Sequence, residues 1–308
     1  MLAFLFPGQG SQATGMGQDL FEQFPVARQI FEEANDALGF DLAGLCFNGP
    51  DEKLKLTENT QPAILTHSIA ALRVLQQEAG LEPDLVAGHS LGEYSALVAA
   101  GALTFADAVR TVRARGQFMQ QAVPVGEGAM AAVLGLDPGT LRSVCAEAAQ
   151  GRVVAPANFN SAGQVVIAGH ADAVGRAVEL AKEKGAKRAL PLPVSAPFHC
   201  ELMKPAADQL AEVLAGIEVA DLRVPVVTNV EARPNTDASR VRDLLVTQVC
   251  APVRWEESMQ YMVDQGVNRF IEIGPGKVLI GLIKRLARGA VLQNFGTVQD
   301  LDEVNRKN

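Results

Sequence analysis

The chain has 308 residues, of which 48% are hydrophobic and 20% charged, a composition typical of a globular protein with room for one large domain and an insert. With 27 Lys and Arg against 35 Asp and Glu, its net charge of −8 gives an overall field that does not attract nucleic acid or an anionic membrane. Its four cysteines form no C-x-x-C pair, which argues against a zinc site or a disulfide framework and suits a reducing compartment.

The first part of the chain is predicted to alternate strands and helices. Apolar runs predict strands at 2–6 and 84–88, and helical spacing of apolar residues predicts helices at 26–39, 62–80, 91–103 and 108–123. Pro62 is expected to begin its helix, while Gly39 and Gly80 end theirs. Thr104 and Asp107 fit a capping box ahead of the fourth helix. This alternation predicts a mainly parallel sheet covered by helices.

The pattern changes after Val123 and later returns. Strands are expected at 129–135, 152–159, 164–169 and 186–194, with helices at 137–150 and 171–185. This β-α-β-β-α-β order is that of a ferredoxin-like α+β subdomain. Strands at 225–230, 268–274 and 290–296, with a helix at 275–289, then resume the first pattern. We therefore expect a large α/β domain (1–124 and 197–308) and a small inserted subdomain (125–196), with a ligand site in the cleft between them.

The string AGHSLGEYSAL (87–97) makes Ser90 a candidate nucleophile. An apolar strand precedes it, a helix follows at once, and Gly88 and Gly92 stand two residues to either side. A tight strand-to-helix turn crowds those two positions and exposes the serine hydroxyl at a helix N-terminus. The alternative is a serine that only caps the helix.

A nucleophilic serine needs a base, and the chain has four histidines. His89 adjoins Ser90 on the turn, where neighbouring side chains diverge. His67 lies mid-helix among packing residues, and His170 lies at a helix start in the insert. His199, in SAPFHC (195–200), lies where the chain leaves the insert, which makes it the best candidate.

The string GQGSQA (8–13) matches the dinucleotide-binding pattern after a strand. That pattern requires an acidic residue at the end of the next strand, but Glu32 and Glu33 fall on a predicted amphipathic helix. The dinucleotide reading therefore fails. Gln9, between two glycines, can still present its backbone N–H to a ligand as an oxyanion donor.

Seven strings in order resemble the malonyl-CoA:acyl carrier protein transacylase family of type II fatty acid synthesis. They are FPGQGSQ (6–12), NTQPAI (59–64), GHSLGEYSAL (88–97), RGQFMQ (115–120), SAPFH (195–199), TQVCAPVRW (247–255) and EIGPGKVL (272–279). The resemblance covers nearly the whole chain. It implies an α/β-hydrolase-like large domain with a ferredoxin-like insert, as the element order does.

The resemblance also implies a role for each matching residue. Ser90 would be acylated, and His199 would act as general base and then acid. The backbone N–H groups of Gln9 and Leu91 would form the oxyanion hole. Arg115 would bind the malonyl carboxylate, although without the resemblance it would read as a solvated helix arginine.

Three further residues receive roles in the same way. Gln248 would hold His199 through its main-chain carbonyl, so that no catalytic Asp is needed. Asn160 would lie beside the CoA or pantetheine arm. Phe198 has the malonyl-selective form of the family pattern, and we expect its ring to fill the space of an α-methyl group.

The expected partners are malonyl-CoA and acyl carrier protein, with no nucleic acid or membrane, and the expected state is a monomer. CoA and phosphopantetheine belong to the substrates, so neither a cofactor nor a metal is expected. The start MLAFLFPGQG lacks the basic segment of a signal peptide, and no apolar run approaches the roughly 20 residues of a membrane helix, so we expect a cytoplasmic protein.

An acidic carrier protein would need a local basic patch on this acidic chain. Two clusters are candidates, and each is equally compatible with a solvated helix face: Lys182, Lys184, Lys187 and Arg188, or Lys284, Arg285 and Arg288. Two other functions stay open. A serine thioesterase or esterase would use the same turn with water as acceptor, and a non-catalytic acyl- or CoA-binding subunit would only carry the motifs.

Overall fold

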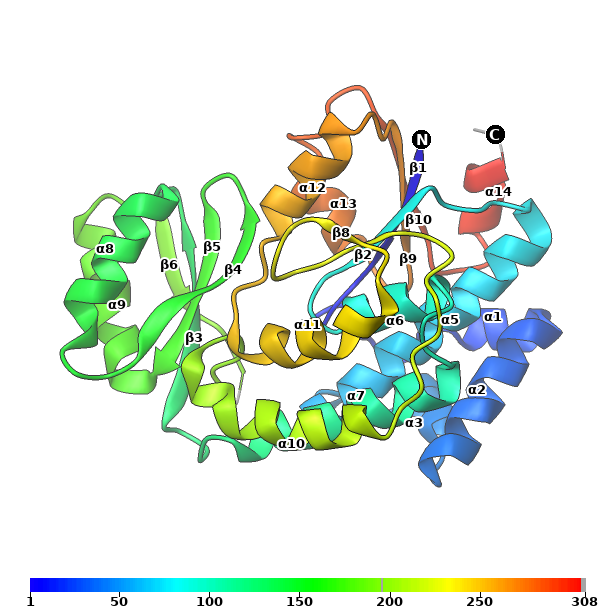
Figure 1. Cartoon of the computed structure of the whole chain (residues 1–308), viewed down its shortest axis with the longest axis horizontal. Coiled ribbons are helices and arrows are strands. Elements are labelled where there is room, and N and C mark those ends of the chain that lie inside the picture. Colours follow the sequence, from blue (N-terminus) through cyan, green and yellow to red (C-terminus); the bar gives the residue numbers. More distant parts are fainter. Residues whose placement is uncertain (195, 306–308) are drawn as a thin grey trace.

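Two sheets of different kinds organise the chain, shown in a computed structural model that describes residues 1–194 and 196–305 (Figure 1). Ser195, the first residue of SAPFH, and residues 306–308 lie outside the described residues. The large sheet has the order β10-β9-β1-β2-β7-β8 and is parallel except for the β7–β8 pair. Its strands are β1 (Leu2–Phe6), β2 (Leu85–Gly88), β7 (Val226–Val227), β8 (Pro234–Asn235), β9 (Arg269–Ile273) and β10 (Val291–Phe295). The expected mainly parallel sheet is confirmed.

Strand β1 lies in the middle of this sheet and is buried on both faces. Phe4 and Phe6 pack into the core on one side, and Ala3 and Leu5 pack into the core on the other. A strand covered on both faces reads as a continuous apolar run, which is why LAFLF shows no alternation. Phe6 pairs with Gly88 at the carboxyl ends of β1 and β2, so the loops that follow these two strands start side by side.

Helices cover both faces of the large sheet (Figure 1). Their bounds are α1 (Gln18–Gln23), α2 (Pro25–Leu38), α3 (Leu42–Asn48), α4 (Asp51–Leu54), α5 (Thr57–Ala79), α6 (Gly92–Ala99), α7 (Phe105–Gln121), α10 (Lys204–Ala215), α11 (Ala238–Cys250), α12 (Trp255–Asp264), α13 (Val278–Ile283) and α14 (Asp300–Asn305). Thr104 caps α7 by accepting the Asp107 N–H, as expected. Among the described residues, none of the helices has the length and apolar character needed to cross a bilayer.

The inserted segment forms its own antiparallel sheet with the order β4-β5-β3-β6. It comprises β3 (Gly128–Leu134), α8 (Pro138–Ala149), β4 (Val154–Ser161), β5 (Gln164–His170), α9 (Ala171–Glu183) and β6 (Arg188–Pro191). The β-α-β-β-α-β order is confirmed, and a separate hydrophobic cluster lies between this sheet and its two helices. The boundaries 125 and 196 stay a prediction.

Helix α5 begins at Thr57, so the prediction that it begins at Pro62 is wrong. Proline inside a helix removes the N–H that would bond to the carbonyl four residues earlier, here that of Glu58. The Arg113 guanidinium from α7 donates to that carbonyl at 2.8 Å and also contacts the Asn59 side chain. A tertiary donor therefore satisfies the acceptor that the proline leaves unpaired.

Two other predicted elements are shorter than expected. The strand expected at 225–230 ends at Val227, because the chain turns there with the Thr228 N–H donating to the Arg233 carbonyl. The helix expected at 275–289 covers only Val278–Ile283 and begins where the buried Glu272 carboxylate accepts backbone N–H groups.

Replacing Arg113 with Met should lower the free energy of unfolding by about 1–3 kcal/mol, because the Glu58 carbonyl loses its donor in a partly buried place. Arg110→Met, on the same helix, removes only an exposed ion pair to Asp107 and should cost less than about 1 kcal/mol. Urea unfolding of both variants measures the difference, and equal losses would contradict this account of α5.

Candidate active site

Ser90 lies on a strained turn between β2 and α6. Its φ of 51° is in the left-handed region, which non-glycine residues rarely adopt. A Cβ on Gly88 would meet the Gly92 carbonyl group at 1.9 Å, and one on Gly92 would meet the Phe6 carbonyl oxygen at 2.1 Å. The turn therefore tolerates no side chain at either position, as the sequence predicted.

His199 is the histidine that reaches Ser90. Its Nε2 lies 2.7 Å from the Ser90 Oγ, and its Nδ1 lies 2.8 Å from the main-chain carbonyl oxygen of Gln248 in α11. A carbonyl only accepts, so Nδ1 must carry the proton, which leaves the Nε2 lone pair facing the hydroxyl. Burial lowers the pKa of His199 to about 3, and the Arg115 charge adds to that effect. The imidazole is therefore neutral and able to accept a proton.

Arg115 brings a buried cation to the same point, and its side chain is only 2% exposed. The guanidinium donates to Gln61 Oε1 at 2.7 Å, to Gln248 Oε1 at 2.9 Å and to Ser90 Oγ at 3.1 Å. Within the described residues, it forms no ion pair with a carboxylate, and its Nε has no hydrogen-bond partner. Burial lowers its pKa. Such a cation is a binding site for an anion.

A cavity of about 220 Å³ contains these groups and the other residues that the sequence singled out. Its lining includes Ser90, His199 and Arg115 together with Gln9, Leu91, Phe198 and Asn160. Gln248 lies just behind them with its side chain fully buried. All eight predicted site residues are thus brought together, seven from segments outside the small sheet and Asn160 from strand β4 of the small sheet.

Gln9 and Leu91 follow the adjacent strands β1 and β2. In the described part of the chain, neither backbone N–H has a hydrogen-bond acceptor. The Gln9 side chain is held by the Thr57 hydroxyl at 2.9 Å. The loop that presents the Gln9 N–H is therefore anchored to α5.

The remaining histidines bond elsewhere. His89 Nε2 lies 2.8 Å from Asn160 Oδ1, His67 Nε2 lies 2.8 Å from the Gly296 carbonyl oxygen, and His170 Nδ1 accepts from the Val153 N–H. Among the described residues, no cluster of three or more His, Cys, Asp and Glu side chains could hold a metal ion.

Sequence reasoning missed three polar residues of the site. Gln61 accepts from Arg115, Asn229 accepts from the Ser90 N–H at 2.7 Å and donates to the Gly88 carbonyl, and Glu93 accepts from Gln248. Each lay within a string already examined, 59–64, 225–230 or 88–97. All three side chains are buried, but each string also contains other polar residues, so the local pattern did not single them out.

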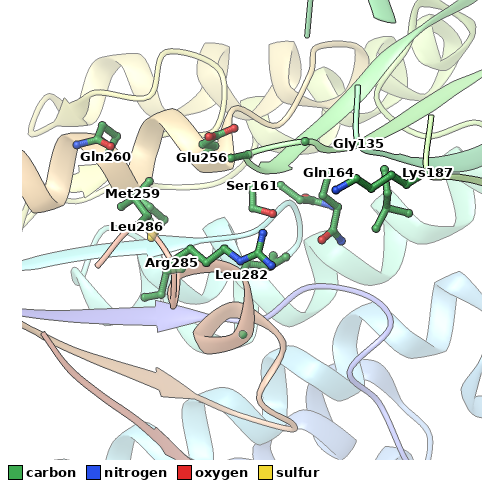
Figure 2. A pocket seen from close by; sticks show the side chains of 16 residues that line it. Gly135, Ser161, Gln164, Lys187, Glu256, Met259, Gln260, Leu282, Arg285 and Leu286 are labelled. Atoms are coloured by element: carbon green, nitrogen blue, oxygen red, sulfur yellow. The ribbon is translucent and has the colours of Figure 1, made fainter. Parts of the chain in front are cut away.

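A second pocket, of about 620 Å³, adjoins the first and shares Asn160 with it. It lies between the β4–β5 turn of the small sheet and helices α12 and α13. Figure 2 shows Lys187 and Arg285 reaching toward this pocket from opposite sides. Neither has an ion-pair partner among the described residues. The pocket therefore joins one residue from each predicted basic cluster.

Comparison with known proteins agrees with the geometry. Residues 3–299 match the acyl transferase domain family. The malonyl CoA-acyl carrier protein transacylase of Escherichia coli (strain K12) is 57% identical over 284 residues, 92% of this chain and 92% of that protein. That of Bacillus subtilis (strain 168) is 56% identical over 288 residues, 93% and 90% of the two chains.

Solved structures give the same result. An acyl carrier protein S-malonyltransferase from Vibrio cholerae has a TM-score of 0.96 and 55% identity, covering 98% of this chain and 99% of its own. A malonyl-transacylase in complex with its type II PKS acyl-carrier protein has a TM-score of 0.97 and 51% identity, covering 100% and 99%. The chain belongs to the malonyl-CoA:acyl carrier protein transacylase family, whose acyl transferase domain spans nearly its whole length.

Proposed function

We propose that this enzyme transfers the malonyl group of malonyl-CoA to the phosphopantetheine thiol of an acyl carrier protein, through a malonyl ester on Ser90, for fatty acid biosynthesis. One observation carries the proposal. The buried Arg115 guanidinium reaches the same Oγ as His199, so a carboxylate bound to the cation would lie beside the nucleophile. CoA and phosphopantetheine come with the substrates, and the proposal needs no further cofactor.

In the first half-reaction, the Ser90 Oγ attacks the malonyl thioester carbon while its proton passes to His199 Nε2. The carbonyl oxygen becomes an oxyanion that the Gln9 and Leu91 N–H groups stabilise, each contributing about 10²–10³ in rate. The carbon–sulfur bond then breaks, the CoA sulfur takes the proton from His199, and CoA leaves. A malonyl ester remains on Ser90.

In the second half-reaction, the phosphopantetheine thiol attacks that ester. His199 accepts the thiol proton and returns it to the Ser90 oxygen as the ester bond breaks. The Gln248 carbonyl keeps the imidazole in the required tautomer throughout, since it accepts from Nδ1. The cycle is ping-pong, and the same enzyme groups act in both half-reactions.

The remaining residues provide selectivity and binding. Arg115 pairs with the malonyl carboxylate, and acetate would leave that buried cation unpaired. Phe198 limits the space beside the α-carbon, and Asn160, at the junction of the two pockets, contacts the pantetheine arm. We further propose that the enzyme is a cytoplasmic monomer with a catalytic domain of residues 1–124 and 197–308 and a small domain of residues 125–196.

The second pocket, of about 620 Å³, is the proposed path of the pantetheine arm of CoA and of the phosphopantetheine arm of the carrier protein. Its two cationic side chains, Lys187 and Arg285, match the phosphate groups that both arms carry. The acyl-carrier protein bound to the similar malonyl-transacylase supports a carrier protein as the second substrate.

Brief mixing of the enzyme with malonyl-CoA should add one malonyl group to the intact protein, as measured by mass spectrometry. Ser90→Ala should give no adduct, because it lacks the attacking oxygen. Free malonate and CoA without an adduct would instead favour the thioesterase. An absence of both adduct and CoA release would favour the non-catalytic binding subunit.

Arg115→Ala should lower kcat/KM for malonyl-CoA by about 10- to 100-fold, because a charge-assisted hydrogen bond of about 1.5–3 kcal/mol is lost. Acetyl-CoA lacks the free carboxylate of malonyl-CoA and serves as the internal control, so its kcat/KM should change much less. Equal losses for both substrates would assign Arg115 to the support of Ser90 rather than to selection.

Lys187→Glu and Arg285→Glu should each raise KM for malonyl-CoA by about 3- to 10-fold at low salt, with less effect at high salt. Lys182→Glu is the matched control, because Lys182 is paired with Glu179 outside the pocket. Acylation kinetics at two ionic strengths measure the effect. A KM unchanged in both pocket variants would exclude this path for the arm.

A further inference from the structure

Glu93 is a buried carboxylate behind the site that none of the steps above uses. It lies in the first turn of α6 and is only 2% exposed. Its Oε2 accepts hydrogen bonds from Gln248 Nε2 at 2.7 Å and from the Asn229 N–H at 3.1 Å. In the described part of the chain it forms no ion pair. A buried, unpaired carboxylate is costly, so its retention beside a reaction centre points to a task there.

Through Gln248, Glu93 reaches both groups that act on Ser90. The Gln248 side chain accepts from Arg115, and its main-chain carbonyl accepts from His199. An ionised carboxylate only accepts hydrogen bonds, so it requires the amide NH₂ of Gln248 to face it. The amide oxygen is thereby turned toward Arg115. Glu93 and the Ser90 main-chain carbonyl, which accepts from the same Nε2 at 2.9 Å, therefore together determine which way this amide points.

Through Asn229, Glu93 also supports the strained turn. The Asn229 side chain accepts from the Ser90 N–H and donates to the Gly88 carbonyl, so it bridges the first part of the turn, from Gly88 to the nucleophile. The carboxylate holds the backbone of Asn229 in place. A second connection therefore links Glu93 to Ser90.

We propose that Glu93 is a positioning residue, which fixes Arg115, His199 and Ser90 in their reactive arrangement by holding the Gln248 amide and the Asn229 backbone. The proposal rests on the proposed function and adds a residue to it. Glu93 touches no substrate. It acts on the reaction only through those two neighbours.

The ionisation of Glu93 provides a distinctive readout. Burial raises the pKa of Glu93 to about 7, against the opposing effects of the Gln248 and Asn229 hydrogen bonds and the Arg115 charge. The titratable or charged groups around it are Arg115 from α7, Tyr94 on α6 and His199, whose pKa is lowered to about 3. Of Glu93 and these three neighbours, Glu93 is the group whose pKa lies near neutral pH. Acylation should therefore rise with pH through about 7 as the carboxylate ionises.

Folding stability should change in the opposite direction. Because the pKa of Glu93 is raised in the folded protein, the neutral form is the one that folding favours. The free energy of unfolding should thus be higher below the ordinary pKa of a glutamate and fall as pH rises through about 7. Glu93→Gln should lack that fall, since an amide does not ionise.

The test is the rate of malonyl-Ser90 formation at saturating malonyl-CoA, measured by rapid quench between pH 5.5 and 8.5. Glu93→Gln should lower the maximal rate by about 10- to 100-fold and remove the rise near pH 7, with KM little changed. Glu93→Asp keeps the charge, so it should keep the rise and recover part of the rate. A wild-type rate and pH profile in Glu93→Gln would overturn the proposal.

Glu272→Gln is the matched control, because Glu272 is another fully buried carboxylate and accepts from backbone N–H groups at the start of α13, including those of Leu279 and Ile280. Its acylation rate should stay within about twofold of wild type, and an equal loss there would also overturn the proposal. If Glu93→Gln does not fold, Glu93→Asp decides instead, because a loss of the rise near pH 7 in a variant that keeps the carboxylate overturns the proposal. A wild type that forms no malonyl adduct would defeat the proposed function itself, which separates the two failures.

Discussion

The buried guanidinium of Arg115 is the constraint on which the rest of the site depends. A permanent cation that is 2% exposed loses most of its hydration, at a cost of several kcal/mol. Three neutral oxygens, from Gln61, Gln248 and Ser90, offset part of that cost. Because no carboxylate pairs with it directly among the described residues, the cation retains capacity for one from the substrate. The polar groups around Ser90 therefore leave the positive charge of Arg115 without a neutralising anion from the described residues, and the apolar core surrounds them.

The proposed nucleophile and the proposed base are both held in unusual backbone conformations. Ser90 and His199 have φ values of 51° and 61°, which cost energy that surrounding contacts must offset. Asn229 braces the first through its side chain, and the Gln248 carbonyl holds the second. The parallel sheet makes this possible, because the carboxyl ends of β1 and β2 open on the same edge.

The spacing of apolar and capping residues in the sequence correctly predicted the elements that depend on contacts between residues close together in the chain. The buried strand LAFLF, the Thr104 cap and the element order of the insert follow from short-range spacing, and the structure has them. The start of α5 was missed because its unpaired carbonyl is satisfied by Arg113, 55 residues away. Glu93 was missed for a similar reason, since its partner Gln248 is 155 residues distant. The resemblance brought in Arg115, which would otherwise read as a solvated helix arginine, and Gln248, which no pattern in the sequence singled out.

The buried charge of Arg115 also explains why a neutral backbone carbonyl, that of Gln248, holds His199. A carboxylate in that place would add a negative charge beside His199 and would weaken the positive potential of Arg115 where the malonyl carboxylate is proposed to bind. It would also raise the pKa of His199, whereas the neutral Gln248 carbonyl orients the ring without adding charge. Glu93, one amide away, balances Arg115 from a distance through the Gln248 side chain. Because the Gln248 carbonyl orients the His199 ring and Glu93 balances the charge from a distance, Arg115 stays available to bind the carboxylate of the substrate.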